Sequence, residues 1–389
     1  MSAIMHDGSG NRGAVSGSTL PAWADWHPSA RYSVGIEEEV MMLDPGDWSL
    51  AQRIDDILPR LSADLAAQVS AETHCAAIEL ATRPHDTAGG APDELAGLRA
   101  SLASELAASG LRAASAGTHP FAVWSDTLVS GGGRYQLVYA SMRELARREP
   151  TFALHVHVGV ADPDEAILLY NRLRCHLPLL LALSGNSPFW QGRDTGLASA
   201  RTPLFQAFPR VGIPRAFPSY AEYVETVDLM LRCDAFPEAT FLWWDVRPQP
   251  RFGTVEVRIM DAQVTSAETT VLASLVQSIA HLELEEGYHT DHLLPEAEVL
   301  AENRFLAARD GMDALLIDPI AERRVPAREL LGRLLEAVRP HAAALGCEAA
   351  LDALPALAEQ TGSTRQLGMA RGPGRLPGLV EQLAGAFVG

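Results

Sequence analysis

Apolar and polar residues alternate along four short stretches of the chain, residues 32–44, 74–82, 152–160 and 253–261. A period of two predicts β-strands that bury one face and usually pair in antiparallel fashion. In the first stretch three acids stand in a row, so Glu37 and Glu39 share one face of the strand while Glu38 points to the other. Adjacent carboxylates repel unless a cation lies between them, although an exposed edge strand would also tolerate them.

The other three stretches carry chemically related side chains at their polar positions. Glu79 lies in the second stretch, His155 and His157 share one face of the third, and Glu256 and Arg258 share one face of the fourth. The simplest assembly is an antiparallel sheet with helices on its apolar face and a charged, concave face opposite. This α+β arrangement makes the charged face the candidate functional site.

Helical periodicity accounts for most of the remaining chain. The expected helices are residues 54–69, 92–116, 136–149, 163–183, 220–233 and 269–287, followed in a helical C-terminal part by 298–309, 326–345, 348–360 and 376–387. The helix at 163 has the clearest limits, because Asp162 can cap its start, Pro163 suits the first turn and Gly185 follows its end.

Three further segments have no clear periodicity. Residues 186–220 combine Pro, Gly, Arg and aromatic residues, which favours an ordered loop that covers a substrate. The glycine run before Arg134 is either a mobile loop that closes over a ligand or a plain connector. Residues 1–21 are rich in Gly and Ser and are expected to form a disordered tail. Since no repeat or linker is evident, residues 22–389 are expected to form one domain.

Composition narrows the function classes. The net charge of −18 argues against nucleic-acid binding, because a duplex partner needs a basic face. All 31 basic residues are Arg, which excludes a P-loop lysine and Schiff-base chemistry. The four cysteines are widely spaced and no secretory signal is present, so a cytoplasmic protein with reduced thiols is expected. The longest apolar run, 177–183, is too short to span a membrane.

Three chemical interpretations fit the charged face. Clustered carboxylates favour binding of Mg²⁺, with Mn²⁺ as the alternative. Because Mg²⁺ ordinarily binds together with substrate phosphates, the first interpretation is metal-assisted phosphoryl transfer. The His155-Val-His157 pattern also occurs in zinc-dependent hydrolases, the second interpretation. The third is a cation-binding face without catalysis, although one would not then expect His, Arg and acids to converge from separate strands.

Several ordered blocks of the sequence resemble one family, the type 2 glutamate–cysteine ligases among the carboxylate–amine ligases. These blocks are Gly35-Ile-Glu-Glu-Glu-Val, Gly117-Thr-His-Pro-Phe-Ala, His155-Val-His-Val-Gly, Asn186-Ser-Pro-Phe-Trp-Gln-Gly, Trp243-Trp-Asp-Val-Arg-Pro and Gly253-Thr-Val-Glu-Val-Arg. The resemblance implies a fold like the catalytic domain of glutamine synthetase. It also implies an ATP-dependent reaction in which a carboxylate is phosphorylated and an amine then displaces phosphate.

The resemblance further implies substrates and residue roles. Glutamate and cysteine are the expected substrates, and a homodimer is compatible with the family. The implied metal ligands are Glu37, Glu39, Glu79, His155 and Glu256. Arg258 is expected to act in catalysis together with Glu256 and His155. Nucleotide binding is the expected role, assigned less specifically, of Arg134, His157, Arg201 and Arg247.

Overall fold

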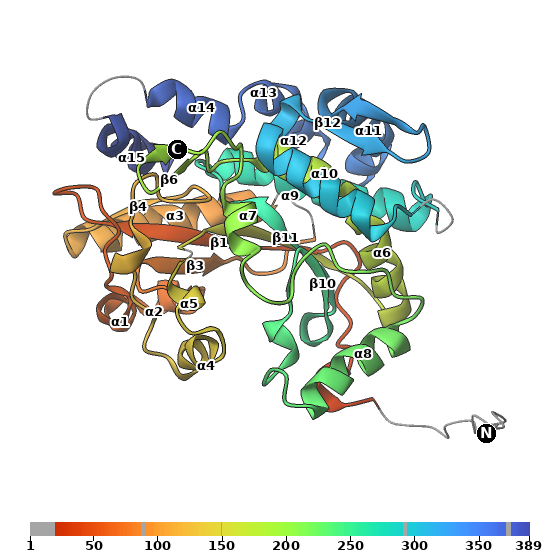
Figure 1. Ribbon diagram of the computed structural model, residues 1–389, viewed down its shortest axis with the longest axis horizontal. Helices are drawn as coiled ribbons and strands as arrows, with labels where there is room; N and C mark the ends of the chain where they lie inside the picture. Colours follow the sequence, from red (N-terminus) through yellow and green to blue (C-terminus); the bar gives the residue numbers. More distant parts are fainter. Residues whose placement is uncertain (1–19, 87–89, 149, 291–293, 371–374) are drawn as a thin grey trace, which may run out of the picture.

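The structure is a computed structural model that describes residues 20–86, 90–148, 150–290, 294–370 and 375–389. The predicted tail lies outside these residues except for Leu20 and Pro21. The chain builds one large antiparallel sheet, covered by helices on one face, with further elements on the other side of the strands (Figure 1).

The large sheet has seven strands, and the four predicted ones lie side by side at its centre. The strand order is β10 (Val246–Gln249), β11 (Thr254–Asp261), β5 (Ala153–Gly159), β1 (Val34–Leu43), β3 (Ala77–Ala81) and β2 (Val69–Ala71), while β4 (Arg112–Ala114) also pairs with β1. Every pairing in this sheet is antiparallel. The predicted fold class, an α+β protein with helices against an antiparallel sheet, is confirmed.

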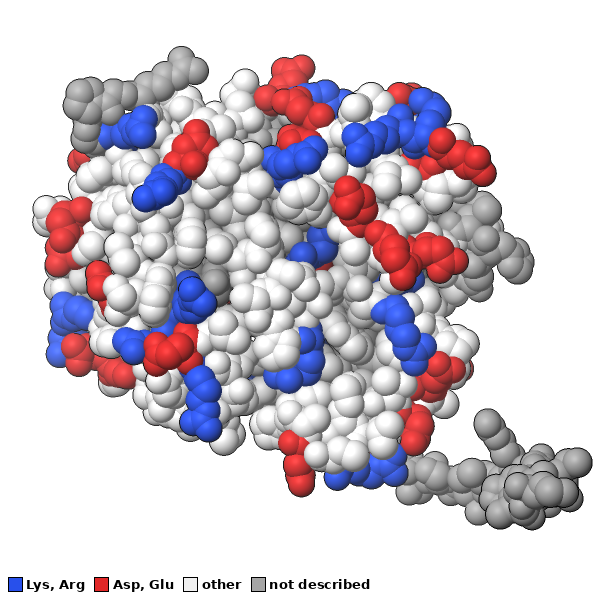
Figure 2. All heavy atoms as spheres, in the orientation of Figure 1, with Lys and Arg blue, Asp and Glu red and all other residues white. Residues whose placement is uncertain are grey.

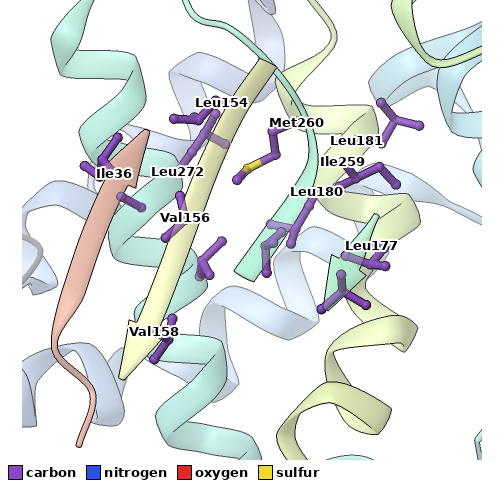
Figure 3. Packing of buried hydrophobic residues seen from close by; sticks show 14 of the residues in the cluster. Ile36, Leu154, Val156, Val158, Leu177, Leu180, Leu181, Ile259, Met260 and Leu272 are labelled. Atoms are coloured by element: carbon purple, nitrogen blue, oxygen red, sulfur yellow. The ribbon is translucent and has the colours of Figure 1, made fainter. Parts of the chain in front are cut away.

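Three long helices cover the apolar face: α3 (Gly90–Ala108), α6 (Pro163–Ser184) and α9 (Ser266–Glu285). Alternation along the strands supplies the apolar partners for these helices. Figure 3 shows this packing for Ile36 of β1, Leu154, Val156 and Val158 of β5, Ile259 and Met260 of β11, Leu177, Leu180 and Leu181 of α6, and Leu272 of α9. Burial of this surface is the main favourable contribution to the stability of the fold.

The start and end of α6 follow the sequence prediction. The Asp162 carboxylate accepts the backbone N–H groups of Asp164 and Glu165 at 3.0 and 2.9 Å, and Gly185 follows the last residue of the helix. Among the described residues α6 is the one helix long and apolar enough to cross a membrane, yet 78% of its apolar window is buried inside the protein. It is therefore the central helix of the core.

The middle acid of β1 points into the apolar face, as predicted. Glu38 is fully buried, and the Arg99 guanidinium of α3 donates to both of its carboxylate oxygens, at 2.8 Å from Nε and 2.5 Å from Nη2. The Thr269 hydroxyl of α9 adds a third donor at 3.1 Å. The buried charge is thus paired and hydrogen-bonded, as a buried carboxylate requires.

Several predicted helices are shorter or divided. Residues 54–69 form α1 (Ile54–Ile57), a 3₁₀ turn containing Pro59, α2 (Ala63–Ala66) and the start of β2. α3 ends at Ala108, because Gly110 adopts a left-handed φ of 77° before β4 begins. A second left-handed residue, Arg143 at φ 58°, separates α4 (Gly133–Met142) from α5 (Leu145–Arg148).

The C-terminal part is mainly helical, but it also contains a hairpin that the sequence did not predict. Its elements are α10 (Ala297–Asp310), β12 (Leu315–Asp318), β13 (Arg323–Pro326), α11 (Ala327–Ala344), α12 (Glu348–Leu351), α13 (Leu354–Glu359), α14 (Gly362–Met369) and α15 (Arg375–Ala386). Helices α10, α11 and α12 pack outside α6 and α9 (Figure 1). α8 (Tyr220–Arg232) packs against α6, while α1, α4 and α5 lie on the other side of the strands (Figure 1).

Candidate active site

Strand register brings the predicted site residues together on the face opposite the helices. Glu37 of β1 lies opposite His155 of β5, and Glu39 lies opposite Glu79 of β3. On the other side of β5, His157 lies opposite Glu256 of β11. Residues directly opposite each other in an antiparallel pair are in contact distance, so the sheet itself builds the cluster.

Glu37 lies between the two histidines. Its carboxylate oxygens are 3.4 Å from His155 Nδ1 and 3.4 Å from His157 Nε2. The Thr254 hydroxyl is 3.0 Å from His157 Nδ1. Burial alone would raise the pKa of Glu37, but His157 and His155 hold it below its usual range. The half-buried Glu37 carboxylate is therefore ionised and could coordinate a cation.

Glu256 is fully buried and is held by cationic and amide donors. Arg247 Nε and Gln249 Nε2 each donate to one carboxylate oxygen at 2.7 Å, and Arg258 donates to the other. These arginines lower the pKa of Glu256 far below its usual range despite burial. Since Arg247 also donates to the carbonyls of Thr240 and Leu242, it positions Glu256 on the sheet.

A group of three acids occupies the β2–β3 end of the face. Glu39 and Glu79 were predicted, whereas Glu72 was not; it follows β2 and joins them within 4.8 Å. Burial and the charge of Glu72 raise the pKa of Glu39 to about 8. Burial and the neighbouring acids also raise the pKa of Glu79 well above its usual value. The only sequence signal for Glu72 was an acid seven residues before Glu79.

Three overlapping groups on this face have the composition of cation sites. They are Glu37–His157–Glu256, Glu37–Glu79–His155 and Glu39–Glu72–Glu79, with all candidate ligand atoms of a group within 4.8 Å of one another. Two observations fit divalent cations. The first is the raised pKa values of the acid group. The second is that the Nε2 atoms of His155 and His157 are buried and make no hydrogen bond of acceptable geometry to the described residues. No such group among the described residues contains both histidines, which disfavours a zinc site built on His155-Val-His157.

A cavity of about 50 Å³ opens beside the acid group. Its walls include Glu39, His155 and Arg258 of the sheet, Glu72 after β2, and Arg201 and Phe205 of one short helix. Arg201 begins α7 (Arg201–Phe205), and its guanidinium donates to the carbonyls of Ile259 and Arg258 at 3.1 and 3.2 Å. The cavity thus combines anionic and cationic walls.

The predicted covering segment 186–220 is ordered. It contains α7 and the strand pair of β6 (Phe189–Trp190) with β7 (Arg193–Asp194). Its strand β8 (Val211–Gly212) pairs with β9 (Trp243–Trp244), which lies outside the segment. The Ser187 and Ser199 hydroxyls donate to the buried Asp261 carboxylate of β11 at 2.6 and 2.9 Å. These bonds fix the segment next to the charged face.

Arg134 lies at the rim of the face and outside the three groups. The glycine run before it enters α4, which begins at Gly133, so the run is the start of a helix. The Arg134 guanidinium pairs with the Glu238 carboxylate and donates to the Thr240 hydroxyl at 2.9 Å. The surface shown in Figure 2 mixes arginines and acids in small groups, so the dense array of acids belongs to the sheet and not to this surface.

Comparison with known proteins identifies the family. The model of glutamate–cysteine ligase family 2 matches residues 33–380. A protein provisionally named glutamate–cysteine ligase 2-1, from Rubrobacter xylanophilus, is 43% identical over 342 residues, which cover 86% of this chain and 89% of the relative. A provisionally named glutamate–cysteine ligase 2 from Herpetosiphon aurantiacus is 38% identical over 92% of this chain and 93% of its own.

The fold is also found in a solved structure. A glutamate–cysteine ligase from Francisella tularensis, in complex with AMP, superposes with a TM-score of 0.67 at 15% identity, over 93% of this chain and 90% of that one. At this identity the likeness establishes the shared fold. The match over residues 33–380 and the identity to the relatives show that the chain belongs to glutamate–cysteine ligase family 2 and is an enzyme of the ATP-dependent ligase class.

Proposed function

We propose that this protein is an ATP- and Mg²⁺-dependent carboxylate–amine ligase that joins the γ-carboxylate of glutamate to the amine of cysteine. The observation that carries the proposal is the row of three carboxylate-rich groups beside Arg258 on one sheet face. The names of the relatives support the two substrates, and AMP in the Francisella tularensis structure supports a nucleotide. The four free cysteines suit a cytoplasmic enzyme.

The cation sites would use the predicted ligands and two additional ones. Glu37, Glu39, Glu79, His155 and Glu256 are the proposed Mg²⁺ ligands, to which we add Glu72 and His157. When bound, Mg²⁺ neutralises charge on the ATP phosphates and on the transferred phosphoryl group. Mn²⁺ prefers similar donors and would be accepted at the same positions.

In the first step a carboxylate oxygen of glutamate attacks the γ-phosphorus of ATP. The bond from that phosphorus to the β–γ bridging oxygen breaks, which releases ADP and leaves an acyl phosphate. Arg258 stabilises the negative charge on the transferring group, because Glu256 and His155 hold its guanidinium at the face. Arg247 and Gln249 keep Glu256 in the required orientation.

In the second step the amine nitrogen attacks the acyl carbon. The bond from that carbon to the phosphate oxygen breaks, phosphate leaves, and the nitrogen loses a proton as the amide forms. Water would compete with the amine, so the ordered segment 186–220 is assigned the role of excluding it. Arg201, which lines the same cavity as Glu39, is assigned the role of binding an anionic substrate group.

The proposal is tested by measuring ADP release from ATP and Mg²⁺ with glutamate and a panel of amines that includes cysteine. Release that requires both glutamate and an amine, with a matching amide detected by mass spectrometry, is expected. ADP release that is independent of any amine, or none with every pair tried, would contradict the ligase assignment. Activity with an amine other than cysteine would keep the ligase and correct the substrate.

A further inference from the structure

A second group of metal-ligating side chains lies away from the charged face. His176 belongs to α6, Glu283 to the last turn of α9, and His289 follows that helix. His176 Nε2 is 2.6 Å and His289 Nδ1 is 2.7 Å from the same oxygen of Glu283. All three candidate ligand atoms lie within 4.8 Å of one another, so one ion could contact them all.

The group is separated from the proposed active site by the sheet. α6 and α9 pack on the apolar face, whereas Glu37 and Glu256 lie on the opposite face. The ligase mechanism therefore gives no role to His176, Glu283 and His289. Their convergence from the interior of α6, the last turn of α9 and the segment after α9 needs an explanation of its own.

The donor set is chemically ready for a transition metal. Glu283 and His176 are both buried, and His289 is half-buried. The second Glu283 oxygen accepts the backbone N–H of His289 at 3.0 Å, which fixes the carboxylate. Two imidazoles with one carboxylate form a recognised zinc ligand set.

A cavity provides room for a further ligand. His176 and His289 line a cavity of about 350 Å³, which is otherwise walled mainly by Leu, Ile and Pro side chains and includes Arg333. Zinc sites with three protein ligands complete their coordination with water or a small ligand. The cavity provides room for that water or small ligand.

We propose that His176, Glu283 and His289 bind Zn²⁺ at a site distinct from the active site, with the remaining position open to this cavity. The ion joins α6 to the last turn of α9 and to the segment that follows it. His176 and Glu283 are 107 residues apart in the chain. The ion thereby stabilises the packing of the helices behind the sheet.

The test is zinc binding by the full chain after removal of metals with a chelator. Zinc stoichiometry is measured by elemental analysis, affinity by competition with a chromophoric chelator, and Co²⁺ absorption reports ligation by imidazole. The wild-type protein is expected to bind one zinc equivalent that His289→Gln loses or binds at least about 10-fold more weakly. Zinc is also expected to raise the melting temperature of the wild type but not of His289→Gln.

Three further variants make the result specific. His281→Gln removes a histidine of α9 that contacts His341 outside the site, so it is a matched control and should keep the zinc equivalent. His157→Gln should also keep it, because that histidine lies on the other face of the sheet. His176→Gln removes a ligand from α6 and should repeat the loss. Equal zinc stoichiometry and affinity in the wild type, His289→Gln and His176→Gln would overturn the proposal and leave only a hydrogen-bonded histidine–glutamate group.

Discussion

At the scale of single residues, the acids of the charged face differ in how they are held. Glu256 is fully buried between Arg247 and Arg258, whereas Glu37 is half-buried and its ion pairs among the described residues are with His155 and His157. The sequence placed both on one face, because alternation fixes the direction of each side chain. It could not distinguish their surroundings, since Arg247 reaches Glu256 through the register of two strands.

The substitution Glu256→Gln should strongly reduce turnover and also weaken the fold. Loss of the charge leaves the buried Arg247 and the partly buried Arg258 without their carboxylate partner. We expect kcat to fall at least about 100-fold and the free energy of unfolding to fall by about 3–5 kcal/mol. Steady-state kinetics and urea denaturation measure the two effects.

The matched variant is Glu37→Gln, which removes a proposed ligand without unpairing an arginine. Its turnover should fall comparably, while its free energy of unfolding changes by about 1 kcal/mol or less. Full activity with normal Mg²⁺ dependence in either variant would refute the site assignment. An equal loss of stability in both would refute the distinction between them.

The raised pKa values of the acid group predict a pH-dependent effect of Mg²⁺ on stability. The pKa of Glu39 rises from 4.5 to about 8 on folding, so the folded protein binds more protons than the unfolded chain between these values. The free energy of unfolding of the metal-free protein should therefore fall as the pH rises through this window. A cation removes the repulsion, so Mg²⁺ should raise the melting temperature more at about pH 8.5 than at about pH 5.5.

Calorimetry with and without Mg²⁺ at the two pH values measures this difference. Glu39→Gln supplies the control, because it removes one of the three acids and should reduce the difference. A Mg²⁺ effect that is the same at both pH values in the wild type would argue against cation binding by Glu39, Glu72 and Glu79.

At the scale of elements, strands were predicted better than helix ends. The period of two located all four central strands, and the Asp162 cap located α6, because both signals are local. The missed breaks depend on single backbone conformations, such as the left-handed Arg143 between α4 and α5. Strand β2 and the β12–β13 hairpin are short, so their alternation was too brief to detect. Glu72 was missed together with β2.

The Glu38–Arg99 pair should be the most sensitive link between β1 and the helices. Arg99 also donates to the carbonyls of Gln263 and Phe387 at 2.8 and 3.1 Å, so it connects four parts of the chain. Arg99→Leu leaves the Glu38 carboxylate buried without its partner and should lower the free energy of unfolding by about 3–5 kcal/mol. Urea denaturation checks this value.

The exposed Arg60 serves as the comparison for that substitution. Arg60→Leu should change the free energy of unfolding by about 0.5 kcal/mol or less. A similarly small change for Arg99→Leu would show that the buried pair contributes little to the fold.

At the scale of the whole molecule, the sheet separates two kinds of chemistry. Its charged face carries the proposed ligase site, and the helices on its apolar face carry His176, Glu283 and His289. The sequence predicted the charged face but not the second group. His176 lies on α6, Glu283 on α9 and His289 after α9, so the three meet only because the helices pack together. The single domain over residues 22–389 and the homodimer stay predictions.

The most direct test of the central claim follows oxygen from the substrate carboxylate. Glutamate labelled with ¹⁸O in its γ-carboxylate is incubated with ATP, Mg²⁺, cysteine and the enzyme, and the released phosphate is analysed by mass spectrometry. An acyl phosphate at the charged face transfers one labelled oxygen to each phosphate formed with the amide. Unlabelled phosphate, produced at the same rate without cysteine, would mean that water attacks ATP and would contradict the ligase account.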